Sequence, residues 1–403
     1  MKLLIINTLY YPNIIGGAEQ SVQLLAEAIC HWGHEVVVVC TSPNPGRTIK
    51  FINSVKVYYL GLKNLYWQFD GKENSLILKP LWHIFDTYNP WMSQEVERII
   101  DTEQPDIVNT NNLGGFSVLV WQAIKKKKIV LIHTLRDYYL LCIRSSMFRK
   151  GKNCDKSCLT CQPYVSMRHN LSRLPDAVVG ISHFILQKHL NLGYFKNCSI
   201  KTTIFNAYSS THTPSISYSA KRTVLRLGYL GRLQADKGIE FLLNSLNSLS
   251  PQTWELWVAG KGAIEYETYL KSNYQLPKVN YLGFVKKEEF FEKIDFLIVP
   301  SLWHEPLGRV VFEAYSYKIP VIASNRGGIP EMIDEGETGF IFDPSHPQTL
   351  VDILSFIIMN PEIQFFMQQQ CLKKSEEFKP KLIYQQYLNL CQKILDSNYT
   401  LNS

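Results

Sequence analysis

The sequence predicts an α/β protein built from two doubly wound domains with parallel sheets. Short β-rich runs alternate with helical stretches, which is typical of a parallel sheet wrapped by helices. This alternation stops once along the chain and then restarts. The chain has 403 residues, and because this is more than one ordinary hydrophobic core holds, two domains of about 150 to 200 residues are expected.

The first half shows strand and helix patterns in regular succession. An apolar run near the N-terminus leads into a helical stretch, and later runs are rich in Val and Ile. These patterns predict a first domain over residues 1–207. The predicted segments are Leu3–Ile6, Gly17–His31, Glu35–Cys40, Val55–Tyr59, Asp106–Asn109, Ile129–His133, Ala177–Gly180 and Ile200–Phe205.

The second half repeats this organisation after a break. Residues Tyr208–Ala220 are rich in Ser, Thr, Pro and His, with little apolar pattern, which predicts a linker. The second domain is therefore expected over residues 208–379. Its predicted segments are Val224–Leu230, Gly238–Leu249, Glu255–Val258, Val279–Leu282, Asp295–Val299, Gly308–Tyr317, Val321–Ala323 and Phe340–Phe342.

The C-terminal residues 380–403 are expected to form a helix that packs back on the first domain. Apolar residues recur at helical spacing within Lys381–Leu395, namely Leu382, Ile383, Tyr387, Leu390 and Ile394. The two domains are expected to face each other across a cleft. Ligands of doubly wound sheets bind beyond the carboxyl ends of the strands, so the residues that follow each strand are the candidate site.

Composition limits the kind of protein and its partners. Apolar residues make up 46% and charged residues 19%, which is typical of a packed globular protein. The apolar runs fall short of the ~20 residues of a membrane span, so a cytoplasmic protein is expected. The net charge of +7 fits a nucleotide donor, a lipid phosphate or the inner membrane face, and does not require nucleic acid. The run Lys125–Lys128 is interpreted as a solvated helix end, and a peripheral membrane contact is the alternative.

Two glutamates after a strand give the most specific signal. Glu305 and Glu313 are separated by seven residues that follow the strand and turn Ile298–Ser301. If a helix begins near Pro306 or Leu307, its unpaired N–H groups receive a phosphate while the carboxylates meet sugar and ribose hydroxyls. The alternative is an acidic residue at a helix start followed by a solvated one.

Cations follow the first strand of the second domain. Gly231 and Arg232 come directly after this strand, and Lys237 with Gly238 follows shortly. Two cations at this edge neutralise a diphosphate without a metal ion. They are otherwise a pair of ordinary surface charges.

Together these motifs resemble the retaining glycosyltransferases of family 4, which have the GT-B fold. The resemblance covers nearly the whole second half, and its motifs occur in the family's order. The matching pieces are Gly231-Arg232, Lys237-Gly238, Gly260-Lys261-Gly262, Gly283-Phe284-Val285, Pro300-Ser301, Glu305 through Glu313, Gly327-Gly328-Ile329-Pro330-Glu331 and Gly336 through Gly339.

The resemblance implies a glycosyltransferase of hexosyltransferase type. Such an enzyme moves a sugar from a UDP- or GDP-type donor to a hydroxyl of a saccharide or lipid-linked acceptor in polysaccharide or glycolipid biosynthesis. It also implies that Arg232 and Lys237 bind the diphosphate, Glu305 the sugar and Glu313 the ribose. The phosphate would meet the backbone of Leu307, Gly308, Arg309 and Val310, and Gly283 and Val285 would flank the base. No catalytic metal is expected.

In the first domain, Gly16 and Gly17 follow the first strand and open a helix. They predict either a loop near the donor phosphate, as in the resembling family, or a glycine turn that only starts a helix. The spacing is not the Gly-x-Gly-x-x-Gly of dinucleotide-binding proteins, which disfavours a dehydrogenase.

One departure from the family pattern concerns its sugar-contacting histidine. In the run His133-Thr134-Leu135-Arg136-Asp137, Arg136 occupies the place of that histidine. His133 is either a substitute for it or a packed residue at a strand end. Arg136 is instead suited to bind a phosphate or carboxylate of the acceptor.

Four of the nine cysteines are clustered. Cys142, Cys154, Cys158 and Cys161 lie in a basic segment that is interpreted as an insertion facing the acceptor. Four thiolates in this spacing suit a structural zinc site, and free thiols or disulfides are the alternatives.

Two other functions compete with sugar transfer. Another enzyme of the same fold, such as a sugar-nucleotide epimerase or a phosphorylase, is disfavoured by the pair Glu305 and Glu313. The rival of a different class is a non-catalytic GT-B-shaped carbohydrate-binding or scaffold subunit, which the replacement of the histidine by Arg136 favours.

Overall fold

The computed structural model describes residues 1–70, 77–208 and 224–402, and these form two compact units. The first unit contains Met1–Met147, Cys154–Ala207 and the C-terminal segment from Pro380. The second contains Phe148–Asn153 and Tyr208–Lys379. Of the linker predicted at Tyr208–Ala220, residues 209–220 lie outside the described residues.

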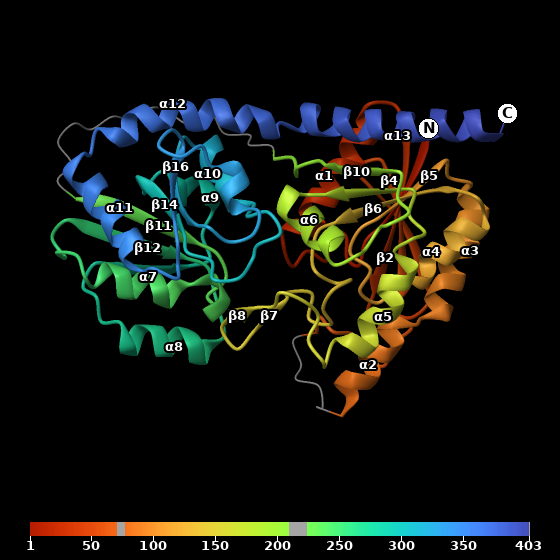
Figure 1. Ribbon diagram of the computed structural model, residues 1–403, viewed down its shortest axis with the longest axis horizontal. Helices are drawn as coiled ribbons and strands as arrows, with labels where there is room; N and C mark the ends of the chain where they lie inside the picture. Colours follow the sequence, from red (N-terminus) through yellow and green to blue (C-terminus); the bar gives the residue numbers. More distant parts are fainter. Residues whose placement is uncertain (71–76, 209–223, 403) are drawn as a thin grey trace. The chain divides into compact units, whose positions relative to one another are not determined.

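An eight-stranded sheet forms the centre of the first unit (Figure 1). Its order is β10-β9-β6-β5-β1-β2-β4-β3, and every pair is parallel except β3 with β4. The strands are β1 (Lys2–Ile6), β2 (Glu35–Ser42), β3 (Arg47–Ile52), β4 (Val55–Gly61), β5 (Ile107–Thr110), β6 (Val130–Leu135), β9 (Ala177–Gly180) and β10 (Ile200–Thr203).

Strand β3 has no counterpart among the predicted segments. It lies at the edge of the sheet, and five of its six residues are exposed, with Phe51 at 72%. Ile52 is half-buried and packs against the core of the first unit. A strand that buries so little shows no clear alternation of apolar and polar residues, so its sequence gives a weak strand signal.

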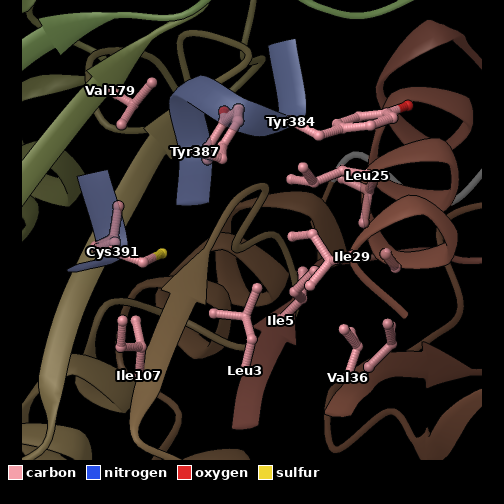
Figure 2. Packing of buried hydrophobic residues seen from close by; sticks show 14 of the residues in the cluster. Leu3, Ile5, Leu25, Ile29, Val36, Ile107, Val179, Tyr384, Tyr387 and Cys391 are labelled. Atoms are coloured by element: carbon pink, nitrogen blue, oxygen red, sulfur yellow. The ribbon is translucent and has the colours of Figure 1, made fainter. Parts of the chain in front are cut away.

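Seven helices of the described part accompany this sheet. They are α1 (Gly17–His31), α2 (Leu78–Thr87), α3 (Pro90–Glu103), α4 (Leu119–Lys126), α5 (Gln162–Leu171), α6 (His183–Asn191) and α13 (Pro380–Asn402). In Figure 2, Tyr384, Tyr387 and Cys391 of α13 lie over the core that Leu25 and Ile29 of α1 share with the sheet. The C-terminal helix thus packs on the first unit, although Leu382, one residue of the predicted stripe, is exposed.

The second unit has a six-stranded, wholly parallel sheet in the order β13-β12-β11-β14-β15-β16 (Figure 1). Its strands are β11 (Leu225–Leu230), β12 (Trp254–Ala259), β13 (Val279–Gly283), β14 (Phe296–Val299), β15 (Val321–Ser324) and β16 (Gly339–Phe342). Its helices are α7 (Ile239–Leu246), α8 (Ile264–Asn273), α9 (Lys287–Phe291), α10 (Val310–Ser316), α11 (Gln348–Met359) and α12 (Ile363–Ser375), with short 3₁₀ turns at Ala235–Lys237, Ile329–Met332 and Glu376–Phe378. The predicted α/β class with parallel sheets is confirmed.

A small antiparallel hairpin, β7 (Phe148–Arg149) with β8 (Lys152–Asn153), completes the second unit. The sequence places these residues in the first domain, whereas their contacts assign them to the second unit. Both flanks of the hairpin, Met147 and Cys154, belong to the first unit, and Cys154 N–H donates to the Met147 carbonyl at 2.7 Å.

No single helix of the described residues is long and apolar enough to cross a membrane. Two consecutive helical segments would be long and apolar enough only if they were taken together, and they are bent by 110° relative to each other. They are Gln348–Met359 and Ile363–Asp396.

Candidate functional site

The loop that follows β14 carries Glu305, and three donors bind the same oxygen of this carboxylate. Glu305 Oε1 accepts hydrogen bonds from Lys237 Nζ at 2.6 Å, Ser301 Oγ at 2.8 Å and Trp303 Nε1 at 3.0 Å. Within the described residues, Glu305 Oε2 accepts none of the side-chain or backbone hydrogen bonds. One carboxylate oxygen is therefore fixed while the other is left for a further donor.

Electrostatics keep this carboxylate ionised. Burial raises the pKa of Glu305, but the charge of Lys237 and the three hydrogen bonds outweigh it, so the pKa is lowered overall. Lys237 also lies 4.7 Å from the ring centroid of Trp303, in a cation–π contact. The lysine is thereby held on two sides.

Close backbone packing shapes the Glu305 loop. Gly238 has φ +74°, and a Cβ there would lie 1.8 Å from the Pro300 carbonyl oxygen. Gly327 has φ +67°, and a Cβ there would lie 2.1 Å from the Glu305 carbonyl oxygen. Only glycine fits both positions, because a side chain would be strained by the backbone angle and would also displace the loop. Gly238 and Gly327, one from each of two sequence motifs, thus allow close packing of the loop that carries Glu305.

A residue that the sequence analysis missed also holds this loop. Asn153, at the end of hairpin strand β8, donates from Nδ2 to the Leu302 carbonyl at 2.8 Å. Its Oδ1 accepts from the backbone N–H of His304 at 2.7 Å. The side-chain amide therefore binds the loop as a neighbouring strand would. No spacing rule relates Asn153 to residues about 150 positions later, so only the folded chain reveals the contact.

Arg232 is a second cation of the candidate site. It follows β11 and is exposed, and its guanidinium forms no hydrogen bond or ion pair with any residue that the structure describes. Its backbone is fixed, because Tyr229 Oη donates to the Arg232 carbonyl at 2.8 Å and Gly231 N–H donates to the Ala259 carbonyl at 3.1 Å. A positioned backbone with an unengaged guanidinium suits recognition of a mobile anion.

Glu313 lies on α10 and is buried, so it is not the solvated residue of the alternative interpretation. Its Oε1 accepts from Lys287 Nζ at 2.7 Å and from Arg309 Nε at 2.8 Å. Helix α10 begins at Val310, which corrects the expected start near Pro306 or Leu307. Gly308 has φ +94°, outside the helical range, and therefore delays the helix.

The segment Gly283–Val285 begins at the last residue of β13, at the same edge of the sheet. Gly283 has φ +68°, and its carbonyl accepts from Gly260 N–H at 2.7 Å. Val285 is half-buried, whereas the intervening Phe284 is 86% exposed. The turn therefore presents an aromatic ring to solvent at the edge where ligands of doubly wound sheets bind.

The glycines of the first unit serve a helix start. Gly16 N–H donates to Glu19 Oε2 at 2.8 Å, and α1 begins at Gly17. The carboxylate of Glu19 thus satisfies one of the unpaired N–H groups at the helix N-terminus. This geometry fits the second interpretation of the motif, a turn that starts a helix.

His133 is a packed residue of the first unit. It is 3% exposed, its Nδ1 lies 2.9 Å from Thr110 Oγ1, and its ring stacks on Phe195 with centroids 5.9 Å apart. Burial lowers the pKa of His133 to about 3. These surroundings fit the packing alternative rather than a substitute for the family's sugar-contacting histidine.

Arg136 is also buried, among amide side chains. Its Nε donates to Asn111 Oδ1 at 2.8 Å, and its NH1 group donates to Asn206 Oδ1. Both of these partners are neutral amide oxygens. Arg136 thus differs from Arg232 in being held by several groups of its own unit.

Three of the four clustered cysteines lie together. Cys161 Sγ is 3.6 Å from Cys158 Sγ and 3.9 Å from Cys142 Sγ. Cys154 follows the hairpin and is half-buried. The described residues contain no group of three or more His, Cys, Asp or Glu side chains that is arranged to hold a metal ion.

Two family models match this chain, one on each half. Residues 15–197 match "Glycosyltransferase Family 4", and residues 225–360 match "Glycosyl transferases group 1". An uncharacterized 42.6 kDa protein in the cps region of Klebsiella pneumoniae is 37% identical over 338 residues, which cover 82% of this chain and 87% of that protein.

The chain belongs to glycosyltransferase family 4. The family matches include every element of the site described above: Lys237, Glu305 and Glu313 lie in the group 1 match, and Asn153 with the cysteines lies in the family 4 match. The family that the sequence motifs resemble is thus confirmed, and with it glycosyltransferase activity as the class of reaction.

Solved structures support the fold of this glycosyltransferase. Anabaena HepE in complex with UDP-glucose matches with a TM-score of 0.69 at 19% identity, covering 98% of this chain and 100% of that one. Sucrose-phosphate synthase from Thermosynechococcus elongatus matches with a TM-score of 0.77 at 17% identity, covering 98% and 99%. These likenesses confirm the GT-B fold.

Proposed function

We propose that this glycosyltransferase transfers a sugar from a UDP- or GDP-type nucleotide donor to an acceptor hydroxyl with retention of the anomeric configuration. The observation that carries the proposal is the arrangement at Glu305. Its Oε1 is held by Lys237, while Oε2 has no partner among the described residues and the guanidinium of Arg232 is unengaged. An anionic donor that carries sugar hydroxyls complements these groups.

Arg232 and Lys237 bind the donor diphosphate. As the bond between the anomeric carbon and the diphosphate breaks, negative charge grows on the leaving phosphate oxygen. Two positive side chains at the carboxyl edge of the sheet stabilise that charge more in the transition state than in the bound donor. Because Lys237 is held by Glu305 and Trp303, little of its conformational freedom is lost when the donor binds.

Glu305 orients the sugar. Its Oε2 accepts a hydrogen bond from a sugar hydroxyl, and because the carboxylate is ionised, this bond is charge-assisted and strong. The fixed Oε1 defines the direction in which Oε2 points. The sugar is thereby held with its anomeric carbon next to the cations that receive the leaving group.

The rest of the donor contacts neighbouring elements. Glu313 Oε2 receives the ribose hydroxyl, since its Oε1 is already bound by Lys287 and Arg309. The exposed ring of Phe284 stacks on the nucleotide base. Support for a nucleotide-sugar donor also comes from the structural neighbour HepE, which was solved with UDP-glucose.

The acceptor is a saccharide or lipid-linked saccharide of polysaccharide biosynthesis. Support comes from the relative in the cps region of Klebsiella pneumoniae. A lipid-linked acceptor requires that the enzyme reach a membrane surface. Three lysines of the run Lys125–Lys128 are paired with acidic residues of their own unit, which lowers the net charge that this run offers to an anionic membrane.

An apolar stripe on α2 supplies the membrane contact instead. Residues at helical spacing along and just beyond α2 are exposed: Ile77 at 78%, Leu81 at 45%, Ile84 at 52% and Tyr88 at 55%. We expect the chain to sediment with vesicles of anionic phospholipid, and the double change Leu81→Asp with Ile84→Asp to reduce the bound fraction several-fold. The matched control is Ile264→Asp, which changes an equally apolar, exposed residue of α8. Equal sedimentation of all three proteins would contradict the membrane contact.

The test of donor use is turnover of a panel of UDP- and GDP-sugars with saccharide acceptors. One donor is expected to be consumed, with release of its nucleoside diphosphate. Binding of a nucleotide without transfer or hydrolysis across the panel would contradict the proposal and favour a non-catalytic carbohydrate-binding subunit.

A further inference from the structure

Three thiols from two segments of the first unit converge on Cys161. Its Sγ lies 3.6 Å from that of Cys158 and 3.9 Å from that of Cys142. A tetrahedral site with Zn–S bonds of about 2.3 Å places its sulfur atoms about 3.8 Å apart. The two observed separations lie on either side of this value. The two separations that involve Cys161 therefore match those between thiolate ligands of one ion.

A backbone N–H group contacts one of these sulfur atoms. Arg144 N–H donates to Cys142 Sγ at 3.4 Å. A metal ion binds thiolates, and an N–H donor to a sulfur atom stabilises its thiolate form.

The surrounding sequence is basic. Between Cys142 and Cys158 the chain carries five cations and one acidic residue, namely Arg144, Arg149, Lys150, Lys152, Lys156 and Asp155. Four thiolates around a divalent ion carry a net charge of two negative units, which this excess of positive charge stabilises. Free thiols need no such surroundings.

Cys154 supplies the fourth ligand. It directly follows hairpin β7–β8. Its backbone N–H donates to the Met147 carbonyl, and this hydrogen bond joins the two ends of the hairpin. Met147 lies five residues after Cys142, so the hydrogen bond connects Cys154 to the segment that carries Cys142. Since the side chains as placed do not surround one point, binding requires rotation about the Cα–Cβ bonds. The cost of such rotations is small beside the roughly 10 kcal/mol or more by which structural zinc binds thiolate sites.

We propose that Cys142, Cys154, Cys158 and Cys161 bind one structural zinc ion, which fixes the base of hairpin Phe148–Asn153. Asn153 at the end of this hairpin holds the backbone of Leu302 and His304, next to Glu305. The metal site does not rest on the proposed function.

Metal analysis of the full chain tests the site directly. The protein, purified without chelator, is expected to contain about one zinc per chain. After exchange with Co²⁺ under reducing conditions, thiolate-to-cobalt charge-transfer absorption is expected. Cys158→Ser and Cys142→Ser are expected to lose most of the metal, and Cys30→Ser, which removes a half-buried thiol outside the cluster, to retain it. A folded wild-type chain that neither contains nor takes up metal, with four reactive thiols or a disulfide in the cluster, would overturn the proposal.

Limited trypsin digestion tests the consequence for the hairpin. Arg149, Lys150 and Lys152 are cleavage sites within it. Removal of zinc by a chelator is expected to increase cleavage at these residues several-fold, with cleavage elsewhere unchanged. Equal cleavage with and without metal would contradict the link between ion and hairpin. Because this readout does not use the sugar donor, it remains decisive even if the proposed function fails.

Discussion

Lys237 Nζ and Glu305 Oε1 lie 2.6 Å apart, although their residues follow different strands of the second sheet. Ser301 and Trp303 bind the same oxygen. The ion pair is therefore part of a fixed network rather than an isolated surface contact, which would contribute little. It sets the orientation of both groups that we assign to the donor.

Glu305→Gln tests the carboxylate. The amide keeps the size of the side chain but loses its charge and one acceptor position. We expect kcat/KM to fall about 10- to 100-fold, because hydrogen bonds to charged groups contribute about 1.5–3 kcal/mol. Glu337→Gln changes an exposed glutamate of the same unit and is expected to leave kcat/KM unchanged. Equal activity of the Glu305 variant and wild type would exclude the proposed sugar contact.

Asn153→Ala tests the hairpin contact. The change removes the two hydrogen bonds to Leu302 and His304. We expect it to weaken nucleoside diphosphate binding about 5- to 150-fold, since two such bonds together contribute about 1–3 kcal/mol. Calorimetric titration measures the effect. Asn280→Ala, at an exposed position of β13, is the control. If both variants bind as wild type does, Asn153 has no positioning role.

Gly238→Ala and Gly336→Ala form a matched pair. Both glycines have positive φ, +74° and +78°, so alanine is strained similarly at each. A Cβ at Gly238 would lie 1.8 Å from the Pro300 carbonyl, whereas none of the described atoms lies within 4 Å of one at Gly336. Gly238→Ala is therefore expected to lower the free energy of unfolding by at least about 2 kcal/mol more than Gly336→Ala. Equal denaturation midpoints would refute the close packing of the Glu305 loop.

Two buried histidines predict a pH dependence of stability in the first unit. Burial lowers the pKa of His133 to about 3 and that of His189 to about 4. Between the ordinary histidine pKa of about 6.5 and these values, the unfolded chain binds protons that the folded chain does not. Unfolding is thus favoured as pH falls, by about 1.4 kcal/mol per pH unit for each fully buried histidine.

Thermal unfolding between pH 7 and pH 4.5 measures this slope. His133→Gln removes one titrating group and is expected to make the loss of stability with falling pH shallower, whatever its effect at pH 7. Asn280→Gln, which removes no titrating group from an exposed position, is expected to leave the slope unchanged. A slope that is the same in all three proteins would contradict the burial of His133 as the cause.

Most of the sheet architecture could be predicted from sequence, because buried parallel strands such as β9 (Ala177–Gly180) are short continuous apolar runs. Edge strand β3 and hairpin β7–β8 could not, since both bury little apolar surface. Their positions depend on backbone pairing and on distant partners. The C-terminal helix was readable from its apolar stripe, apart from the exposed Leu382.

The candidate site shows the same division. Lys237 and Glu305 were identified from motif spacing because each follows a strand, and strand ends share one edge of a parallel sheet. The packing of His133, the burial of Arg136 and the contact of Asn153 with His304 depend on residues far apart in the chain. Spacing alone holds no information about them. The later start of α10 follows from the positive φ of Gly308, which a motif does not reveal.

The central claim is that Lys237 and Glu305 form the donor site, and calorimetric titration with UDP, GDP and their sugars tests it most directly. We predict that one nucleoside diphosphate binds the wild-type chain, that Lys237→Ala weakens its binding at least about 10-fold, and that Lys278→Ala, at an exposed position of the same unit, does not. Glu305→Gln is expected to weaken binding of the nucleotide sugar more than binding of the nucleoside diphosphate, because only the sugar contacts Glu305 directly. Equal binding by wild type and Lys237→Ala, or no binding of any nucleotide by the folded chain, would contradict the claim.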